Sequence, residues 1–140
     1  MIFSSHPFQY RKNRRNMKTD NELIAEFIPE FMEEQNWHRL HWKDALFDKS
    51  WDWLMPVVEK IQDPEISEEG RVIRSSADVT IYYKACRIEY IGDEEAGDDR
   101  GDWSTHQQGE TKIEAAYKAV VEFIKWYNSN QSQDSHNSTI

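Results

Sequence analysis

DVTIYYKACRIEYI, residues 78–91, is the stretch in which apolar and polar residues alternate most clearly, as they do in a β-strand. The apolar positions are odd in its first half and even in its second: Val79, Ile81 and Tyr83, then Cys86, Ile88 and Tyr90. A strand with one core face must absorb this change of phase, so we expect a β-bulge near Lys84–Ala85. A tight turn there is the alternative, although the segment has neither Gly nor Asn to form one.

Two further short strands are expected beside this segment. Residues 72–75 precede it, and Trp103 to Gln107 follow a polar, Gly-punctuated connection. The sheet is therefore antiparallel and has two or three strands. Because so small a sheet is not stable alone, helices must cover one of its faces.

Two helices are predicted before the strands. The first begins at Thr19, which has capping-box spacing to Glu22, and Pro29 should kink it or end it near Ile28. The second spans residues 50–62, with Ser50 as its N-cap. Its apolar stripe contains Leu54, Met55, Val58 and Ile61.

The clearest amphipathic helix of the chain is predicted over residues 111–128. Thr111 and Glu114 again have capping-box spacing, and Glu114 can pair with Lys118 one turn later. One face is apolar and contains Ile113, Ala116, Tyr117, Val120, Ile124 and Tyr127. This helix is expected to pack on the sheet.

We therefore predict one α+β domain over residues 18–128. It comprises two N-terminal helices, a two- to three-stranded antiparallel sheet and a C-terminal amphipathic helix. Residues 1–17 are expected to form a disordered basic arm, and residues 129–140 a disordered polar tail. A further hypothesis is that translation begins at Met17, whose following residues resemble a natural protein start, and that the arm is not translated.

Charge is distributed unevenly along the chain. The first 16 residues hold four of the 17 basic residues (Arg11, Lys12, Arg14 and Arg15) and none of the 26 acidic ones. The other 124 residues thus carry 13 basic and 26 acidic side chains, a net charge of −13. Such a body repels nucleic acid and favours a basic partner. Contact with nucleic acid through the basic arm remains an alternative.

The sequence excludes some classes of protein and site. No apolar run approaches the ~20 residues that a membrane helix needs, so no membrane association is predicted. A single cysteine, Cys86, fits a reducing cytoplasm and is interpreted as a small buried hydrophobe. The acidic stretch from Asp93 to Asp102 lacks the EF-hand pattern and is interpreted as solvated charge. Neither a cofactor nor a catalytic motif is predicted.

Three stretches carry a resemblance to a known group: NELIAEF at 21–27, SWDWLMPVVEKI at 50–61 and TKIEAAYKAVVEFIKWYN at 111–128. Together with the strand pieces around Val79 and Cys86, they resemble small uncharacterised proteins of phages and prophages in Bacteroidetes-type bacteria. These look related to the phage α-β-α (ABA) sandwich domain group. The resemblance implies a cytoplasmic accessory protein of phage origin and assigns no functional residue.

His38, His41 and Asp44 form the one candidate metal site of the sequence. On a helix, this spacing would bring the two imidazoles to one side, and Cys86 or His106 could add a ligand. Two His without a Cys pair are short of a zinc-finger pattern. Surface or stacking histidines between Trp37 and Trp42 are the simpler interpretation, and a small metal-dependent protein or enzyme is the alternative.

The aromatic residues form the candidate partner-binding set. Trp51 and Trp53 flank Asp52 and point about 200° apart on a helix, so both cannot enter one core stripe. Phe123 and Trp126 flank the apolar face of the last helix. These rings either complete the core or form an exposed patch ringed by acids. We therefore expect a non-enzymatic module with an acidic surface that binds a host or phage protein.

Overall fold

The computed structural model describes residues 18–35 and 45–130 and shows helices combined with antiparallel sheets, which confirms the α+β class. The helices are α2 (Asp20–Phe27), α3 (Pro29–Glu34), α4 (Trp51–Gln62) and α5 (Lys112–Asn130). The strands are β1 (Glu65–Ile66), β2 (Val72–Arg74), β3 (Ala77–Tyr82), β4 (Ala85–Ile91) and β5 (Asp102–Gln108), and the 3-10 helix η2 (Glu94–Ala96) lies between the last two strands.

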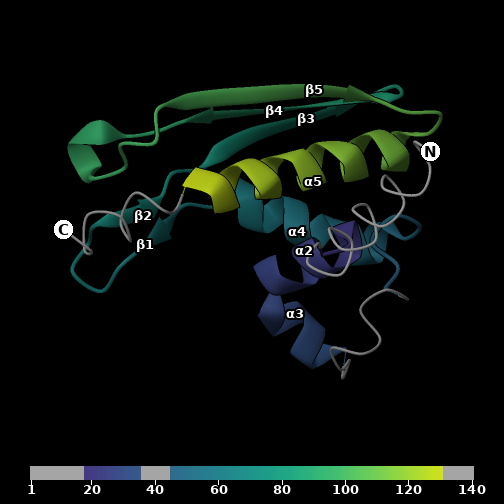
Figure 1. The fold of residues 1–140 in the computed structure, drawn as a ribbon, viewed down its shortest axis with the longest axis horizontal. Helices are drawn as coiled ribbons and strands as arrows, with labels where there is room; N and C mark the ends of the chain where they lie inside the picture. The colour runs from purple at the N-terminus through teal and green to yellow at the C-terminus, as the bar shows by residue number, and fades with distance from the viewer. Residues whose placement is uncertain (1–17, 36–44, 131–140) are drawn as a thin grey trace, which may run out of the picture.

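The main sheet is antiparallel in the order β3-β4-β5, and β1 and β2 form a separate two-stranded hairpin. Figure 1 shows α5 running along one face of the main sheet, with α2, α3 and α4 on that same side. No described element covers the opposite face, so the described residues do not form a sandwich with helices on both faces. None of the described helices is long and apolar enough to span a membrane.

The hydrophobic core lies between the sheet and the helices. Cys86, Ile88 and Tyr90 of β4 point into it and are at most 1% exposed, whereas Arg87, Glu89 and Ile91 face the open side. From α5 the core receives Ala115, Ala116, Ala119, Val120, Val121, Phe123, Ile124 and Tyr127. The buried thiol of Cys86 agrees with its interpretation as a small hydrophobe, and burial raises its pKa to about 11.

The first helical segment follows the sequence closely. Thr19 Oγ1 accepts from the Glu22 N–H at 3.1 Å, and Glu22 Oε1 accepts from the Thr19 N–H at 3.1 Å, which completes the capping box. α2 ends at Phe27, and α3 begins at Pro29. Proline lacks an N–H and disfavours helical geometry in the residue before it, so the expected interruption near Ile28 is confirmed.

The helix predicted over residues 50–62 is α4, but the capping by Ser50 was wrong in one respect. Ser50 is the N-cap residue, yet its side chain makes no capping hydrogen bond. Trp53 is buried and packs edge-on against Phe31 and Phe47, while Trp51 is 37% exposed. The two indoles thus diverge as their spacing predicted.

The predicted bulge near Lys84–Ala85 was wrong, and the alternative turn is present. β3 and β4 pair from Ala77↔Tyr90 to Tyr82↔Ala85, so Tyr83 and Lys84 form a two-residue hairpin loop. Tyr83 adopts φ +50°, the positive value that tight hairpin loops require and that Gly or Asn usually supplies. The odd and even apolar positions therefore belong to two strands with one common core face.

The helix predicted over residues 111–128 is α5, which continues two residues further, to Asn130. Thr111 Oγ1 accepts from the Glu114 N–H at 3.2 Å, and Glu114 Oε1 accepts from the Glu110 N–H instead of closing the box on Thr111. The predicted pair of Glu114 with Lys118 is present at 4.0 Å. The expectations for the arm and for residues 131–140 lie outside the described residues.

Replacing Tyr83 by Gly is expected to raise the free energy of unfolding by about 1 kcal/mol, because glycine adopts positive φ without strain. Tyr83 is 76% exposed and loses little packing. Urea unfolding measures the change. Lys84→Gly is the matched control, because the other loop residue has no positive φ and should gain nothing. Equal gains in the two variants would contradict this account of the turn.

Candidate protein-binding surface

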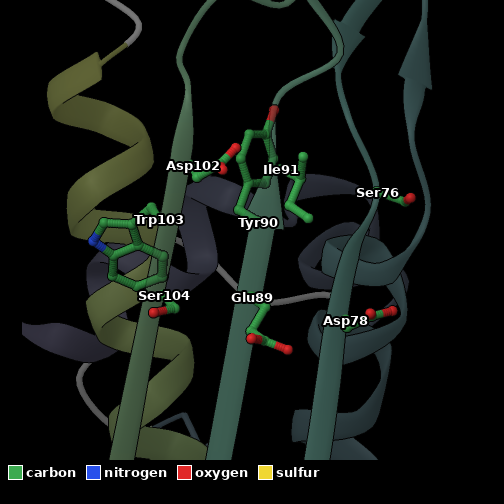
Figure 2. Close-up of a pocket in the computed structure, with 8 residues that line it drawn as sticks. All are labelled: Ser76, Asp78, Glu89, Tyr90, Ile91, Asp102, Trp103 and Ser104. Carbon is green, nitrogen blue, oxygen red and sulfur yellow. The ribbon is translucent and has the colours of Figure 1, made fainter.

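The open face of the sheet carries a shallow hollow of about 680 Å³. Figure 2 shows its lining, which comes from all three strands and from the residue before β3. The lining residues are Ser76, Asp78, Glu89, Tyr90, Ile91, Asp102, Trp103 and Ser104. Ile91 projects from the end of β4, between Asp102 and Ser76, and is 68% exposed. A large apolar side chain is thus presented on a largely polar face, which also carries the exposed ring of Tyr82.

A second hollow of about 830 Å³ adjoins the first and shares Ser76, Ile91 and Asp102 with it. Its lining adds a second exposed apolar side chain, Ile66 of β1, which is 55% exposed. We call the two hollows together the Ile91 surface. Its acidic residues are Asp78, Glu89, Asp93, Glu94, Glu95 and Asp102, and no basic residue is among the described residues that line it.

Two of these acidic residues lie directly opposite each other. The register pairs Asp78 of β3 with Glu89 of β4, and Ser104 of β5 lies opposite Glu89 on its other side. Like charges at directly opposed positions destabilise a sheet. The exposed Arg87 offsets part of this repulsion, since its Nε lies 3.9 Å from Glu89 Oε1. A cation bound between Asp78 and Glu89 would relieve the remainder.

The loop that borders the Ile91 surface is held by a buried carboxylate. Asp98 is 1% exposed and accepts hydrogen bonds from Ser75 Oγ at 2.7 Å, from the Ser75 N–H at 3.2 Å and from the Tyr90 hydroxyl. It also accepts from the Arg100 N–H at 3.2 Å and from Arg100 Nη1 at 3.0 Å. Ser75 Oγ in turn accepts from the Asp93 N–H at 3.1 Å. The network joins residues 93–100 to the segment between β2 and β3.

These contacts determine the protonation of Asp98. Burial alone would raise its pKa, but the hydrogen bonds from Tyr90, Ser75 and the Arg100 backbone outweigh burial and lower the pKa below its usual value. The pKa of Tyr90 is raised, first by burial and then by its hydrogen bond to Asp98. Asp98 therefore stays ionised and Tyr90 neutral across the physiological range.

Arg100 continues this network toward Tyr127 of α5, and Arg74 lies over the same ring. Arg100 donates to the Ile73 carbonyl at 2.9 Å, and its guanidinium lies 4.7 Å from the centre of the Tyr127 ring. Arg74 donates to the carbonyls of Lys60 and Asp63 at the end of α4. Three buried nitrogens have no hydrogen-bond partner within the described structure: Arg74 Nε, Arg74 Nη1 and Arg100 Nε. Both guanidiniums lie near aromatic rings, which offset part of this cost through cation–π attraction.

The four aromatic residues predicted to bind a partner do not form one exposed patch. Phe123 is fully buried and Trp53 is 9% exposed, because both pack into the core. Trp126 is partly buried and stacks on Trp103 with ring centres 5.1 Å apart. Trp51 alone of the four is exposed. The interpretation of these rings as core material therefore applies to Phe123 and Trp53.

The candidate metal site of His38, His41 and Asp44 lies outside the described residues. The two further ligands suggested for it lie on opposite faces of the sheet: Cys86 is buried against the helices, and His106 is on the open side. There His106 Nε2 forms a hydrogen bond of 2.5 Å with the Tyr82 hydroxyl. Among residues 18–35 and 45–130, no three His, Cys, Asp or Glu residues form a group that could hold a metal ion.

The Ile91 surface itself was not identified from the sequence. The expected bulge hid the pairing of Asp78 with Glu89, and Asp102 was interpreted as part of a solvated charge run. A hairpin at Tyr83–Lys84 would have placed Asp78 opposite Glu89, so the signal was present in the change of phase. Comparison with known proteins adds nothing here, since the chain matches no protein family, no curated protein and no solved structure.

Asp98→Asn is expected to lower the free energy of unfolding at pH 7 by about 3 kcal/mol, because it leaves Arg100 buried without its counter-charge. Since the pKa of Asp98 is lower in the folded than in the unfolded chain, its stabilisation is complete above its usual pKa of 3.8. That stabilisation is lost as the pH falls through the folded pKa. Urea titrations from pH 7 to pH 2 should therefore show a smaller fall in the free energy of unfolding at acid pH for the variant, that is, a flatter acid limb of the stability curve.

The exposed neighbour Asp99 provides the control. Asp99→Asn should leave both the stability at pH 7 and the acid limb close to those of the original protein. An acid limb that is unchanged in Asp98→Asn would show that other carboxylates cause the acid sensitivity.

Proposed function

We propose that this protein is a non-enzymatic binding module whose Ile91 surface receives a basic, partly apolar segment of another protein. The observation that carries the proposal is the opposition of Asp78 and Glu89 beside the exposed Ile91. An apolar centre with a charged rim is the usual anatomy of a protein interface. The acidic rim makes a basic partner the favourable one and disfavours nucleic acid.

The charge distribution supports binding in preference to a purely structural role. A sheet selected for stability alone has no reason to keep two carboxylates opposite each other. The repulsion between Asp78 and Glu89 would be relieved when a Lys or Arg side chain of a partner binds between them. Ile91 and Ile66 supply apolar area that becomes buried at the same moment.

The biological setting of the proposal rests on the sequence. The resemblance to phage and prophage proteins supports an accessory role, with a host or phage protein as the partner. Cys86 is the one cysteine of the chain and is buried, which supports a reducing compartment such as the cytoplasm.

A pull-down from nuclease-treated host lysate tests the proposal with two charge-matched variants. Asp78→Asn/Glu89→Gln/Asp102→Asn removes three acids from the Ile91 surface, and Glu34→Gln/Glu59→Gln/Glu68→Gln removes three exposed acids elsewhere. A protein captured by the original chain and the second variant, and lost by the first, supports the proposal. A blank with the original chain, or equal capture by both variants, overturns it.

The opposed carboxylates also predict a trade-off between stability and binding. Asp78→Asn should raise the free energy of unfolding by about 0.5 kcal/mol, because it removes the repulsion from Glu89. The same change should weaken capture of the basic partner. Urea unfolding measures the first effect, and Glu95→Gln is the control because no strand partner opposes Glu95. A variant that is less stable than the original protein would contradict the repulsion.

A further inference from the structure

β5 is an edge strand of the main sheet as the structure describes it, with one row of backbone groups that no described strand pairs with. Within the described residues, β4 is its one strand partner. The Gly109 N–H donates to the Lys84 carbonyl, and the Gly92 N–H donates to the Gly101 carbonyl. These two bonds show which pairs of the ladder between β4 and β5 are hydrogen-bonded. In an antiparallel pair, hydrogen-bonded and non-hydrogen-bonded positions alternate. The backbone groups that point away from β4 therefore belong to Asp102, Ser104, His106 and Gln108.

This edge lacks most of the devices that usually block pairing with another strand. Residues 102–108, DWSTHQQ, contain no proline, no glycine, no lysine and no bulge, and Asp102 is their only formal charge. Among residues 18–35 and 45–130, the one side chain that bonds to this row is Lys118, whose Nζ donates to the Gln108 carbonyl at 3.1 Å. A carbonyl oxygen has two lone pairs, so this contact leaves room for a further donor.

Apolar surface accompanies the edge on its helical side. Trp103 of β5 and Trp126 of α5 are stacked and only partly buried. A strand added beside β5 would cover more of both rings. The other edge strand, β3, offers less: its outward backbone groups belong to Ala77, Val79 and Ile81, and α4 packs against it.

We propose that a second copy of this chain pairs antiparallel with β5 and joins the two main sheets into one. The occupant follows from the self-complementarity of the strand. A two-fold axis at Thr105 places Asp102 opposite Gln108 of the second copy, and Ser104 opposite its His106. All four outward residues then exchange backbone hydrogen bonds. No like charges face each other across the new ladder.

Neighbouring registers are less favourable. An axis at His106 places the two imidazoles opposite each other, and an axis at Ser104 leaves Gln108 opposite Arg100, outside the strand. The register about Thr105 is therefore the one with the longest ladder. This pairing is independent of the proposed partner at the Ile91 surface and requires only the chain itself.

The net charge of each chain gives the dimer a distinctive salt response. Two copies that each carry a charge of −9 repel each other, so added salt should strengthen their association by screening. Binding of a basic partner has the opposite response. The two associations are therefore distinguishable in one titration.

Sedimentation of the full chain, of 16.7 kDa, over about 1 μM to about 1 mM tests the proposal, since this range spans weak and moderate affinities. Ser104→Lys should abolish the dimer. Thr80→Lys is the matched control: it lies on the same open face, but its backbone is paired with Arg87. Ser104→Pro should weaken the dimer by about tenfold or more, because symmetry removes the same donor twice. Circular dichroism checks that each variant is folded.

The outcomes separate clearly. A dimer that strengthens with salt, is lost in Ser104→Lys and persists in Thr80→Lys supports pairing through β5. A protein that stays monomeric throughout the range overturns the proposal, as does a dimer insensitive to both Ser104 variants. A dimer lost in Thr80→Lys and kept in Ser104→Lys would instead place the contact on the open face of the sheet and would also overturn the proposal. None of these results depends on whether a basic partner exists.

Discussion

The buried carboxylate of Asp98 accepts hydrogen bonds from Ser75, Tyr90 and Arg100, and it joins three segments at one point. These are the junction of β2 with β3, the end of β4 and the loop that leads into β5. Without this network, residues 93–100 would have few apolar contacts to hold them, because they are largely polar and exposed. The second hollow of the Ile91 surface therefore depends on an interaction made in the core. Loops that are already ordered lower the entropy cost of binding, so this network would favour the partner proposed for the Ile91 surface.

The hairpin at Tyr83 and Lys84 determines which side chains of β4 face the core and which face the open side. Because side chains alternate with a period of two, a loop one residue longer or shorter would exchange the faces of β4. The two-residue loop puts Cys86, Ile88 and Tyr90 into the core, and it leaves Glu89 and Ile91 on the open side. The chain accepts a positive φ at a non-glycine residue to obtain this register. Tyr83 thus carries a local strain that the burial of the core face outweighs.

Most of the fold could be predicted from the sequence because its signals are local. The Thr19–Glu22 capping box, the interruption at Pro29 and the apolar face of α5 each follow from spacing within a few residues. The hairpin was only the alternative to a bulge, because turn propensity argued against Tyr-Lys, whereas the phase change of the apolar residues is explained by a two-residue turn. The Ile91 surface was missed for a non-local reason: its acidic residues come from three strands and a loop. Their proximity depends on a register that the wrong turn assignment had hidden.

The one-sided packing of the sheet connects these features. The described helices all lie on one side, where Cys86, Ile88 and Tyr90 of β4 are buried and the apolar residues that β3 and β5 turn to the helices are at least partly buried, and the opposite face is free to carry charge. In such a sheet the open face and the edge of β5 contribute little to folding, and their sequences are released from the demands of the core. The partner and the dimer proposed for these two surfaces would account for Asp78 opposite Glu89 and for an edge without lysine or proline, which the fold itself does not require. The buried core between the sheet and the helices provides the stability that offsets these locally unfavourable features.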